Sequence, residues 1–509
     1  VTSVDVTVTA VTTISGTLTE AHTLYENTAN FTGLGSEAVT ITSTTIDADL
    51  LVELNADTDQ LITFSGTVTA VTGDVANVED VFTANNTDAV NSITGIDTDA
   101  TVTVSGDSNN IIVAADLNTL NGLVSSVIQI DSSATTLKGD HDVVEASLIQ
   151  NKTRADANDT TGVATPTISG LNGLALTIDD GITRDELIAL QTNYTTGVIT
   201  ATIEESTMAE LLAETDGVND IASGDAFSVV LTQTAINAED LVELNGMTSG
   251  LITVEADDSG VGASTITGSL ADVKAIMEAK VASGNGILDT SVADAIIELD
   301  DVGSVSAADL KVVLAATSAD VDLNAGVSTI TGLLGDINTI LADATLNSNA
   351  DGGANTQALV ITDSSVTASA VKTLIPDGAQ LTSGDITFIS STLTGDFGDI
   401  EDIYETGGLI DEHIGDSPND ASNVYGLDSI NITVSGTTTT AEQARIVSGY
   451  TSGIVTATLA NTLTMDDLLD SAAGLNEAIT TTANNFTITV DDPVVQASEL
   501  ITLAGRTAG

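Results

Sequence analysis

A stretch of sequence that occurs twice constrains the fold more than any other feature of this chain. Residues 194–203, with the sequence YTTGVITATI, return as YTSGIVTATL at residues 450–459, about 256 positions further on. The match continues beyond this stretch, because TMAELL at 207–212 corresponds to TMDDLL at 464–469. Self-similarity of this kind is typical of repeat proteins, in which each repeat packs mainly against its neighbours.

Within the repeated region, residues 181–203 predict a short helix, a glycine turn and a strand. Apolar residues at positions 182, 187, 188 and 190 follow Thr183, which can cap a helix, and two acidic residues that suit its first turn. Gly197 can then turn the chain, and residues 198–203 are rich in β-branched side chains. One repeat therefore contains at least one helix and one strand.

Two types of helix alternate along the sequence. The first begins with Ala-Asp-Leu or a close variant, and we expect it at 46–54, 113–120, 236–244 and 305–314, with weaker copies at 366–374 and 495–503. The second follows an apolar residue, Thr and Gly, and we expect it at 71–78, 266–273, 330–337 and 393–400. Each type carries one strand and one helix in roughly 25 to 35 residues, the size of known solenoid repeats.

Strand, helix and strand in short succession favour parallel pairing with right-handed crossovers. We therefore predict an α/β fold, a repeat solenoid of alternating short parallel strands and short helices that runs through residues 1–509 as one continuous array. A soft division is expected near residues 217–225, and no Pro-rich linker marks a domain boundary. The alternative is a parallel β-helix, against which the Ala-Asp-Leu helices count.

The charge of the chain limits its partners and its surroundings. The 509 residues include 74 acidic and 10 basic side chains, and the formal net charge is −64. Such a surface repels nucleic acid and anionic lipid, and its self-repulsion costs stability unless salt or cations screen it. No run of 18 apolar residues is present. We therefore expect an extracellular or cell-surface location, with neither a nucleic-acid partner nor membrane insertion.

Several predicted strands end in aspartate, which would place a row of carboxylates along one rim of the array. These residues are Asp131, Asp179, Asp180, Asp300, Asp301, Asp363, Asp491 and Asp492. Carboxylates stacked closely recruit a cation or a proton, and hard oxygen ligands suit Ca²⁺. The alternative is that each aspartate caps a helix or accepts hydrogen bonds from turn amides. The sequence has neither an EF-hand loop nor the nonapeptide of calcium-binding β-rolls.

Residues that could carry catalysis are not grouped in a recognisable motif. His22, His141 and His413 lie far apart, and the sequence has no Gly-x-Ser-x-Gly elbow, P-loop or dinucleotide fingerprint. Cysteine is absent, which excludes disulfides and thiol chemistry. Aromatic residues make up 2% of the chain without any Trp, whereas sugar-processing clefts rely on aromatic platforms. We therefore expect no enzymatic activity.

The two ends of the sequence correspond to successive positions of one repeat. Residues 1–12 align with 61–72, since TVTAVT is identical in both, and 503–509 align with 244–250. By this alignment the sequence stops where the next strand is expected to begin. We expect either head-to-tail stacking of copies, which generates an open filament, or a segment of a longer solenoid.

The repeats, the absence of cysteine and the acidic composition rich in Thr, Ala, Asp and Gly resemble the large acidic secreted repeat proteins of bacterial cell surfaces, of the S-layer, matrix-fibre or adhesin type. The resemblance covers the whole chain in composition, without a motif specific to one family. It implies an exported, non-enzymatic and self-associating protein, often with calcium. Similar chains also occur in virion fibres.

Two functions from different classes follow from these features. The first is a structural protein, an extracellular repeat solenoid that self-assembles head to tail into a filament or surface layer. The alternative is a binding module, an adhesin or virion-fibre segment that contacts a glycan or a cell surface with calcium. An exposed apolar or aromatic patch confined to one region would favour the second function.

Overall fold

The computed structural model is an α/β protein whose described residues contain sixteen α-helices and thirty-two strands. The described residues are 6–27, 29–85, 92–155, 159–194, 197–213, 224–255, 264–281, 288–347, 357–374, 384–406, 424–436, 438–470, 474–475 and 484–508. The chain divides into two compact parts, of which the first contains 1–231 and 243–253 and the second 232–242 and 254–509. The division expected near 217–225 falls mostly on residues outside the described ones.

The described residues of the first part form four parallel sheets. A small sheet pairs β1 (Val6–Thr7) with β3 (Phe31–Thr32), and a second has the order β2 (Thr13–Gly16), β4 (Ala38–Ile41), β6 (Ile62–Phe64) and β8 (Ile93–Thr94). The third has the order β13 (Ile168–Ser169), β11 (Ile128–Ile130), β9 (Thr101–Ser105), β7 (Ala70–Asp74) and β5 (Thr45–Asp47). The fourth has the order β10 (Ile111–Val113), β12 (Thr136–Gly139), β14 (Ala175–Ile182), β15 (Ile199–Ile203), β16 (Ala226–Leu231) and β18 (Ile252–Val254).

The second part contains three parallel sheets of five strands among its described residues. The first has the order β17 (Ala235–Asn237), β19 (Thr265–Gly268), β20 (Ile296–Leu299), β22 (Val321–Leu323) and β24 (Leu346–Asn347). The second has the order β21 (Gly303–Ser306), β23 (Val327–Gly332), β25 (Ala358–Ile361), β27 (Ile386–Phe388) and β29 (Val424–Tyr425). The third has the order β26 (Ser365–Thr367), β28 (Thr392–Gly395), β30 (Asn431–Val434), β31 (Val455–Thr458) and β32 (Asn485–Thr487).

Strand partners come from neighbouring repeats of the sequence. Val71 pairs in parallel with Val102, and Ile266 pairs in parallel with Ile297, each 31 residues further along the chain. A parallel partner requires a crossover that returns the chain to the same edge of the sheet, and helices of one repeat supply it. The parallel pairing expected from the sequence is therefore confirmed.

Both predicted types of helix form where the sequence places them. The Ala-Asp-Leu type comprises α2 (Ala48–Asp57), α4 (Ala114–Leu123), α8 (Ala238–Met247), α10 (Ala307–Ala316), α12 (Ala368–Leu374) and α16 (Ala497–Ala504). The Thr-Gly type comprises α3 (Val75–Asn85), α9 (Leu270–Val281), α11 (Leu334–Leu341) and α13 (Phe397–Glu401). The other helices are α1 (Leu18–Glu26), α5 (His141–Asn151), α6 (Arg184–Asn193), α7 (Met208–Leu211), α14 (Ala441–Tyr450) and α15 (Met465–Leu469).

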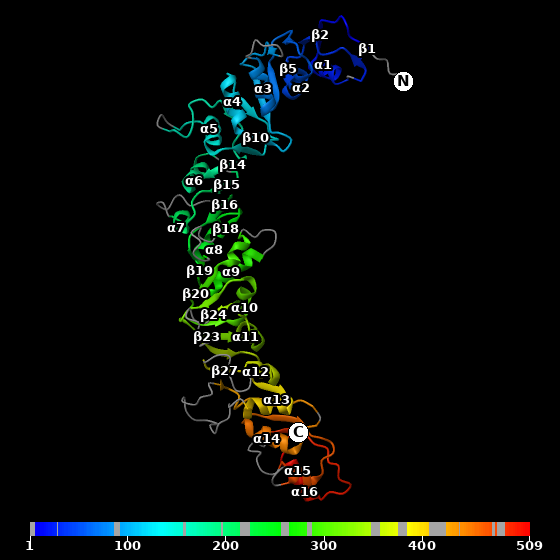
Figure 1. The fold of residues 1–509 in the computed structure, drawn as a ribbon, viewed down its shortest axis with the longest axis vertical. Helices are drawn as coiled ribbons and strands as arrows, with labels where there is room; N and C mark the ends of the chain where they lie inside the picture. The colour runs from blue at the N-terminus through cyan, green and yellow to red at the C-terminus, as the bar shows by residue number, and fades with distance from the viewer. Residues whose placement is uncertain are drawn as a thin grey trace. The chain divides into compact units, whose positions relative to one another are not determined.

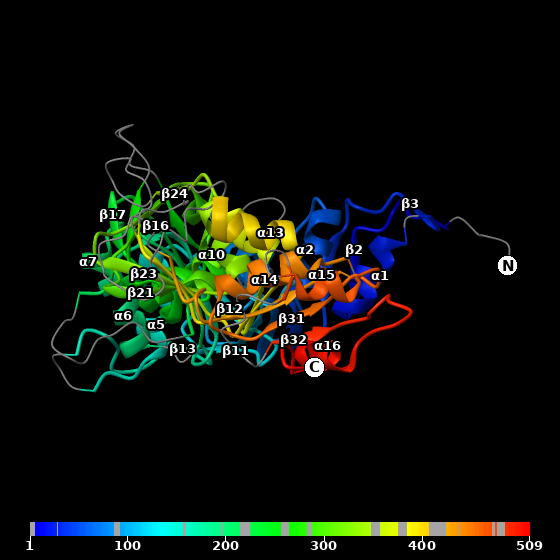
Figure 2. The same ribbon diagram turned by 90° about the horizontal axis from the view of Figure 1, so that it is seen from below.

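Successive helices contact one another beside the sheets. In the first part this holds from α1 to α5, and in the second from α9 to α14, where the helices follow one another beside the strands (Figures 1 and 2). The core lies between helices and sheets, where Leu51, Val71 and Leu117 are fully buried. Among the described residues, no helix has the length and apolarity needed to cross a membrane. We call each helix, with the strand or strands before it, a repeat, and number the repeats by their helices.

Candidate functional site: the contacts between neighbouring repeats

In five of the six Ala-Asp-Leu helices, the alanine at the start packs against a glycine of the following repeat. The five pairs are Ala48 and Gly73, Ala114 and Gly139, Ala238 and Gly268, Ala307 and Gly332, and Ala368 and Gly395. All five alanines are fully buried. A Cβ placed on these glycines would lie between 2.5 and 3.3 Å from the alanine Cβ. Because carbon atoms in contact are about 3.5–4.0 Å apart, only glycine allows this approach.

This contact explains why the two types of helix alternate. Glycine of the apolar-Thr-Gly signal ends a strand, as Gly332 ends β23, and receives the alanine that begins the helix of the repeat before it. The small side chains bring helix and strand close together. The glycine in the signal that predicts the second type of helix is therefore also the residue on which a helix of the first type packs.

Six helices that begin with a larger residue use a different contact with the next repeat. Their first backbone N–H, which has no partner within the helix, donates to a side chain of the following repeat. The pairs are Leu18 to Ser43 Oγ at 3.1 Å, His141 to Asp180 Oδ1 at 2.8 Å, Arg184 to both oxygens of Glu205 at 2.9 Å, Leu270 to Asp301 Oδ2 at 2.7 Å, Leu334 to Asp363 Oδ2 at 2.6 Å and Met465 to Asp492 Oδ2 at 2.5 Å. A carboxylate here also faces the positive end of the helix dipole.

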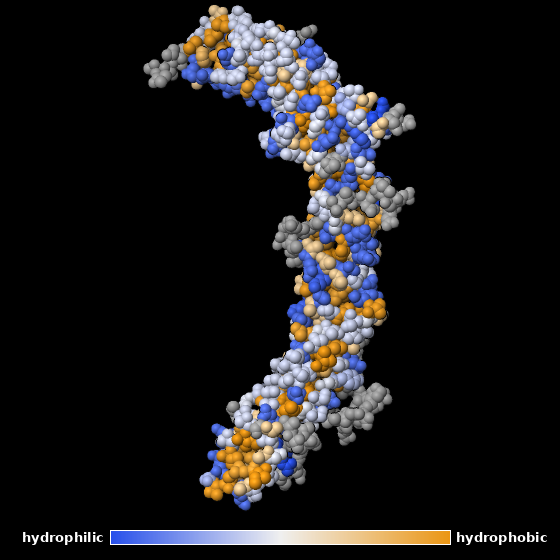
Figure 3. Space-filling model, turned by 180° about the vertical axis from the view of Figure 1, so that it is seen from behind, coloured by the Kyte–Doolittle hydropathy of each residue, from blue (hydrophilic) through white to orange (hydrophobic). Residues whose placement is uncertain are grey.

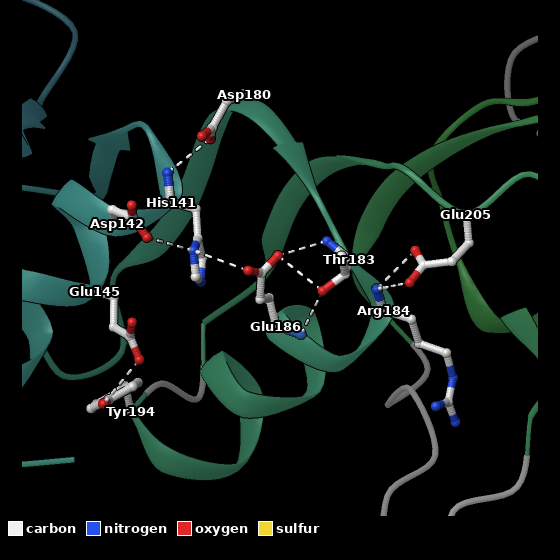
Figure 4. A network of polar contacts seen from close by, with 9 residues as sticks. All are labelled: His141, Asp142, Glu145, Asp180, Thr183, Arg184, Glu186, Tyr194 and Glu205. Carbon is white, nitrogen blue, oxygen red and sulfur yellow. Dashed lines mark hydrogen bonds and ion pairs between the residues drawn. The ribbon is translucent and has the colours of Figure 1, made fainter. Parts of the chain in front are cut away.

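Two of these caps lie in one polar network that joins repeats 5, 6 and 7 (Figure 4). Asp180 caps α5, and Glu205 caps α6. Within α6, the carboxylate of Glu186 accepts from the backbone N–H of Thr183 at 2.8 Å and from its hydroxyl at 2.9 Å. The backbone hydrogen bond is the main reason that the pKa of Glu186 lies below its usual value. The network holds each helix start in a fixed position relative to the next strand.

His141 lies inside this network rather than in an open cleft. Its ring is 11% exposed, and its Nδ1 lies 3.5 Å from an oxygen of Asp142 and 3.9 Å from an oxygen of Glu186. Figure 4 shows the imidazole between these two carboxylates, one from its own helix and one from α6. The position of His141 at the first residue of α5 makes it part of the contact between repeats.

Side-chain contacts to carboxylates also link successive helices, three of them through a lysine. His22 Nε2 lies 2.7 Å from Glu53 between α1 and α2, and Lys274 Nζ lies 2.6 Å from Asp309 between α9 and α10. Lys311 pairs with Asp336 at 2.7 Å, and Lys372 with Asp399 at 2.8 Å and Asp402 at 2.7 Å. These contacts are partly exposed, so each adds little to the stability of the folded chain. The three lysines place scarce positive charge between neighbouring acidic helices.

The eight aspartates proposed as a calcium rim lie in or after five strands, each in a different sheet. Asp131 follows β11, Asp179 and Asp180 lie in β14, Asp300 and Asp301 follow β20, Asp363 follows β25, and Asp491 and Asp492 follow β32. Asp180, Asp301, Asp363 and Asp492 are the helix caps described above. Helix capping, the alternative interpretation of these residues, therefore holds for these four, although the capped helix belongs to the preceding repeat.

The other four aspartates make local contacts. Asp131 Oδ1 accepts from the backbone N–H of Ser133 at 2.8 Å, which lowers the pKa of Asp131, and Asp179 lies 3.4 Å from Lys138 Nζ. Asp300 and Asp491 donate their backbone N–H groups to carbonyls of the preceding repeat. Across the described residues, no three His, Cys, Asp or Glu side chains are grouped to hold a metal ion. Calcium binding stays a prediction.

The first and last repeats contain the same contact residues with one partner missing from the described chain. Ala497 begins α16 as Ala238 begins α8, yet Ala497 is exposed and Ala238 is fully buried. Gly16 ends β2, and a Cβ at this position would meet only the Glu20 side chain, at 3.2 Å. The Ile-Ser-Gly sequence at 14–16 is the variant of apolar-Thr-Gly that could have identified Gly16 from the sequence.

No protein family, curated protein or solved structure matches the chain. The contacts between repeats are the recurrent chemical feature of this chain.

Proposed function

We propose that this chain is a non-enzymatic structural protein of the extracellular space or cell surface, an α/β solenoid that assembles head to tail into a filament or layer. The recurrent chemistry of the described residues supports this proposal. Strands pair with strands of the next repeat, alanines pack on glycines of the next repeat, and carboxylates cap helices of the preceding one. These contacts can be propagated from one copy to the next without a new type of surface.

The apolar surface of the last repeat is the observation that carries the proposal. Leu500 in α16 is 43% exposed, whereas Leu241, its counterpart in α8, is fully buried. Ile501 is 74% exposed and Val494 is 87% exposed. In Figure 3, hydrophobic residues gather over the region that Figure 1 labels α15 and α16. A patch of this kind favours burial against another protein surface, which the adhesin alternative also requires. Its position beside Ala497 favours a second copy of this chain as that surface, because the equivalent alanines of the other Ala-Asp-Leu helices pack on a glycine of the next repeat.

The net charge sets the conditions in which the polymer forms. At −64 per chain, copies repel one another at low ionic strength, and the Debye length shortens from about 30 Å at 0.01 M salt to about 8 Å at 0.15 M. Salt or divalent cations therefore promote assembly. We include calcium as a counter-ion in this proposal, in keeping with an extracellular location.

Negative-stain electron microscopy and sedimentation velocity test the proposal on the full chain in marine-like salt, with calcium and with chelator. We expect filaments or layers whose amount increases with protein concentration. Polymers that vanish with chelator indicate cation bridging, and polymers that persist indicate assembly through the protein surfaces alone. Particles of single-chain mass at all concentrations in both solutions would refute assembly by this chain.

A matched pair of variants separates the apolar patch from a general effect of charge. The double variant Leu500→Asp and Ile501→Asp places two carboxylates on the exposed face of α16 and should abolish assembly. The control, Val302→Asp and Ile389→Asp, adds the same charge at residues that are 88% and 62% exposed elsewhere in the second part. We expect the control to assemble like the original chain. If the two double variants assemble equally well, the exposed face of α16 is not part of the interface.

A further inference from the structure

We propose that residues 494–497 of one chain bind β2 and Gly16 of a second chain, in the register that β17 and α8 keep with β19. This inference rests on the proposed head-to-tail assembly and names the residues that make it. The partner is a second copy of this chain, and the contact combines parallel strand pairing with an alanine packed on a glycine.

The contact between repeats 8 and 9 provides the template, and its residues lie within the second part. In β17 and β19, Ala235 is opposite Thr265, Ile236 is opposite Ile266 and Asn237 is opposite Thr267. Ala238 follows directly as the first residue of α8, and a Cβ on Gly268 would lie 2.5 Å from its Cβ. Ile236, Ala238 and Ile266 are each at most 1% exposed. The strand pair and the small-residue contact thus form one buried unit.

Residues 494–497 correspond to the first half of this template. Val494-Val495-Gln496-Ala497 matches Ala235-Ile236-Asn237-Ala238, and in both places the alanine begins a helix. Gln496 has an extended backbone, with φ −81° and ψ 139°, which suits strand pairing. Val495 is half-buried, whereas the equivalent Ile236 is 1% exposed.

The beginning of repeat 1 corresponds to the second half. Thr13-Ile14-Ser15-Gly16-Thr17-Leu18 matches Thr265-Ile266-Thr267-Gly268-Ser269-Leu270, and Leu18 and Leu270 each begin a helix. Both helices are capped in the same way, since the N–H of Leu18 donates to Ser43 and the N–H of Leu270 donates to Asp301. β2 is the edge strand of its sheet, with β4 on its other side. Ile14 is half-buried, although Ile266 is fully buried.

Transfer of the template register gives one specific interface. Val494, Val495 and Gln496 lie opposite Thr13, Ile14 and Ser15 of the second chain, and Ala497 packs on Gly16. Neither 13–18 nor 494–498 contains a charged residue, although the chain carries 74 acidic side chains. Pairing these neutral segments buries apolar side chains. The carboxylate beside the contact, that of Glu20, is held by hydrogen bonds from the backbone N–H and the hydroxyl of Thr17.

An exchange of methyl groups tests this register. Within the chain, Gly16→Ala adds a Cβ that meets only the Glu20 side chain, whose carboxylate oxygen accepts from Thr17. The same Cβ would lie about 2.5 Å from Ala497 of the next copy if the template of Ala238 and Gly268 applies. Overpacking of this size reduces association by about tenfold to a hundredfold. Adding Ala497→Gly in the same chain removes the second methyl and should restore assembly. Gly66→Ala is the control, because a Cβ there has nothing within 4 Å.

The outcomes separate this interface from the proposed function. If the original chain forms polymers and Gly16→Ala forms them equally well, the register is wrong while head-to-tail assembly stands. Rescue by Ala497→Gly supports the register, because a merely unfolded variant would not be rescued.

Disulfide trapping tests the same register when polymers do not form. The chain has no cysteine, so Ser15→Cys and Gln496→Cys can be made singly and mixed under oxidising conditions. Neighbouring strands fall within the Cα separation of about 4.4–6.8 Å that a disulfide requires. We expect a cross-linked dimer from this mixture and none from Thr17→Cys with Gln496→Cys. The pair Asn237→Cys and Thr267→Cys in one chain is the positive control, and a dimer-free mixture beside a positive control overturns the inference.

Discussion

Replacement of Gly332 by alanine tests whether the fit of alanine on glycine between repeats stabilises the fold. Gly332 ends β23, and a Cβ at this position would lie 2.6 Å from the Cβ of Ala307 and 3.5 Å from its backbone nitrogen. Ala307 is fully buried at the start of α10, so neither group can turn away. Helix and strand would have to separate by about 1 Å to reach normal carbon contact.

The size of the effect follows from two opposing contributions. Overpacking of a well-packed site costs about 1–3 kcal/mol. Alanine has less conformational freedom than glycine in the unfolded chain, which stabilises the folded state by about 0.4–1 kcal/mol. This gain applies because Gly332 is not among the glycines with positive φ. We therefore expect Gly332→Ala to lower the free energy of unfolding by about 1.3 kcal/mol, within a range of roughly 0–2.6 kcal/mol.

Gly335 provides a control three residues away. It lies inside α11, and a Cβ there has nothing within 4 Å, so Gly335→Ala should stabilise the protein by about 0.5–1 kcal/mol. The combination of Gly332→Ala with Ala307→Gly should recover part of the loss, since one methyl then occupies the site. The two single variants and the double variant form a cycle that measures the coupling of this pair.

Urea unfolding followed by circular dichroism measures these differences, and hydrogen exchange of peptides from 307–316 and 327–332 localises them. Localisation matters because a repeat array can unfold in segments, so that a single midpoint averages over several transitions. If Gly332→Ala is as stable as Gly335→Ala and hydrogen exchange is unchanged in both peptides, the contact between Ala307 and Gly332 does not stabilise the fold.

Two further predictions concern the acidic side chains. Asp301→Ala removes the acceptor of the Leu270 N–H and should lower the free energy of unfolding, measured by urea titration, by about 0.5–2 kcal/mol. Two controls should stay within about 0.5 kcal/mol of the original chain: Asp301→Asn, which keeps an oxygen acceptor, and Asp300→Ala, which removes an exposed side chain. Burial, followed by the nearby carboxylates of Glu79, Asp80 and Asp74, raises the pKa of Asp116, so its ionised form destabilises the folded state at neutral pH and this penalty fades as the pH falls through the folded-state pKa. Asp116→Asn should therefore raise the thermal midpoint at pH 7, with a gain that shrinks toward pH 4 and in high salt; a gain that grows at low pH would contradict this sign.

Local structure is the level at which sequence reasoning succeeded. The Ala-Asp-Leu and Thr-Gly signals predicted α2, α4, α8, α10, α9 and α11 at their observed positions, because capping, apolar spacing and glycine turns are set by residues close in the chain. Parallel pairing followed from the short alternation of strand and helix. The apolar-Thr-Gly motif predicts a helix from the sequence. That its glycine contacts an alanine of another repeat does not follow from the sequence.

The sequence by itself determined the repeat, the two types of helix and the large negative charge. Only the tertiary structure decided which residues meet across repeats: that Ala307 packs on Gly332, that Asp301 caps the helix that begins at Leu270, and that Ala497 stays exposed. These pairs lie 25 to 31 residues apart, at separations set by how strands stack in the sheets. A hydrogen bond or a close methyl contact depends on fractions of an ångström in that stacking, which spacing along the chain does not encode.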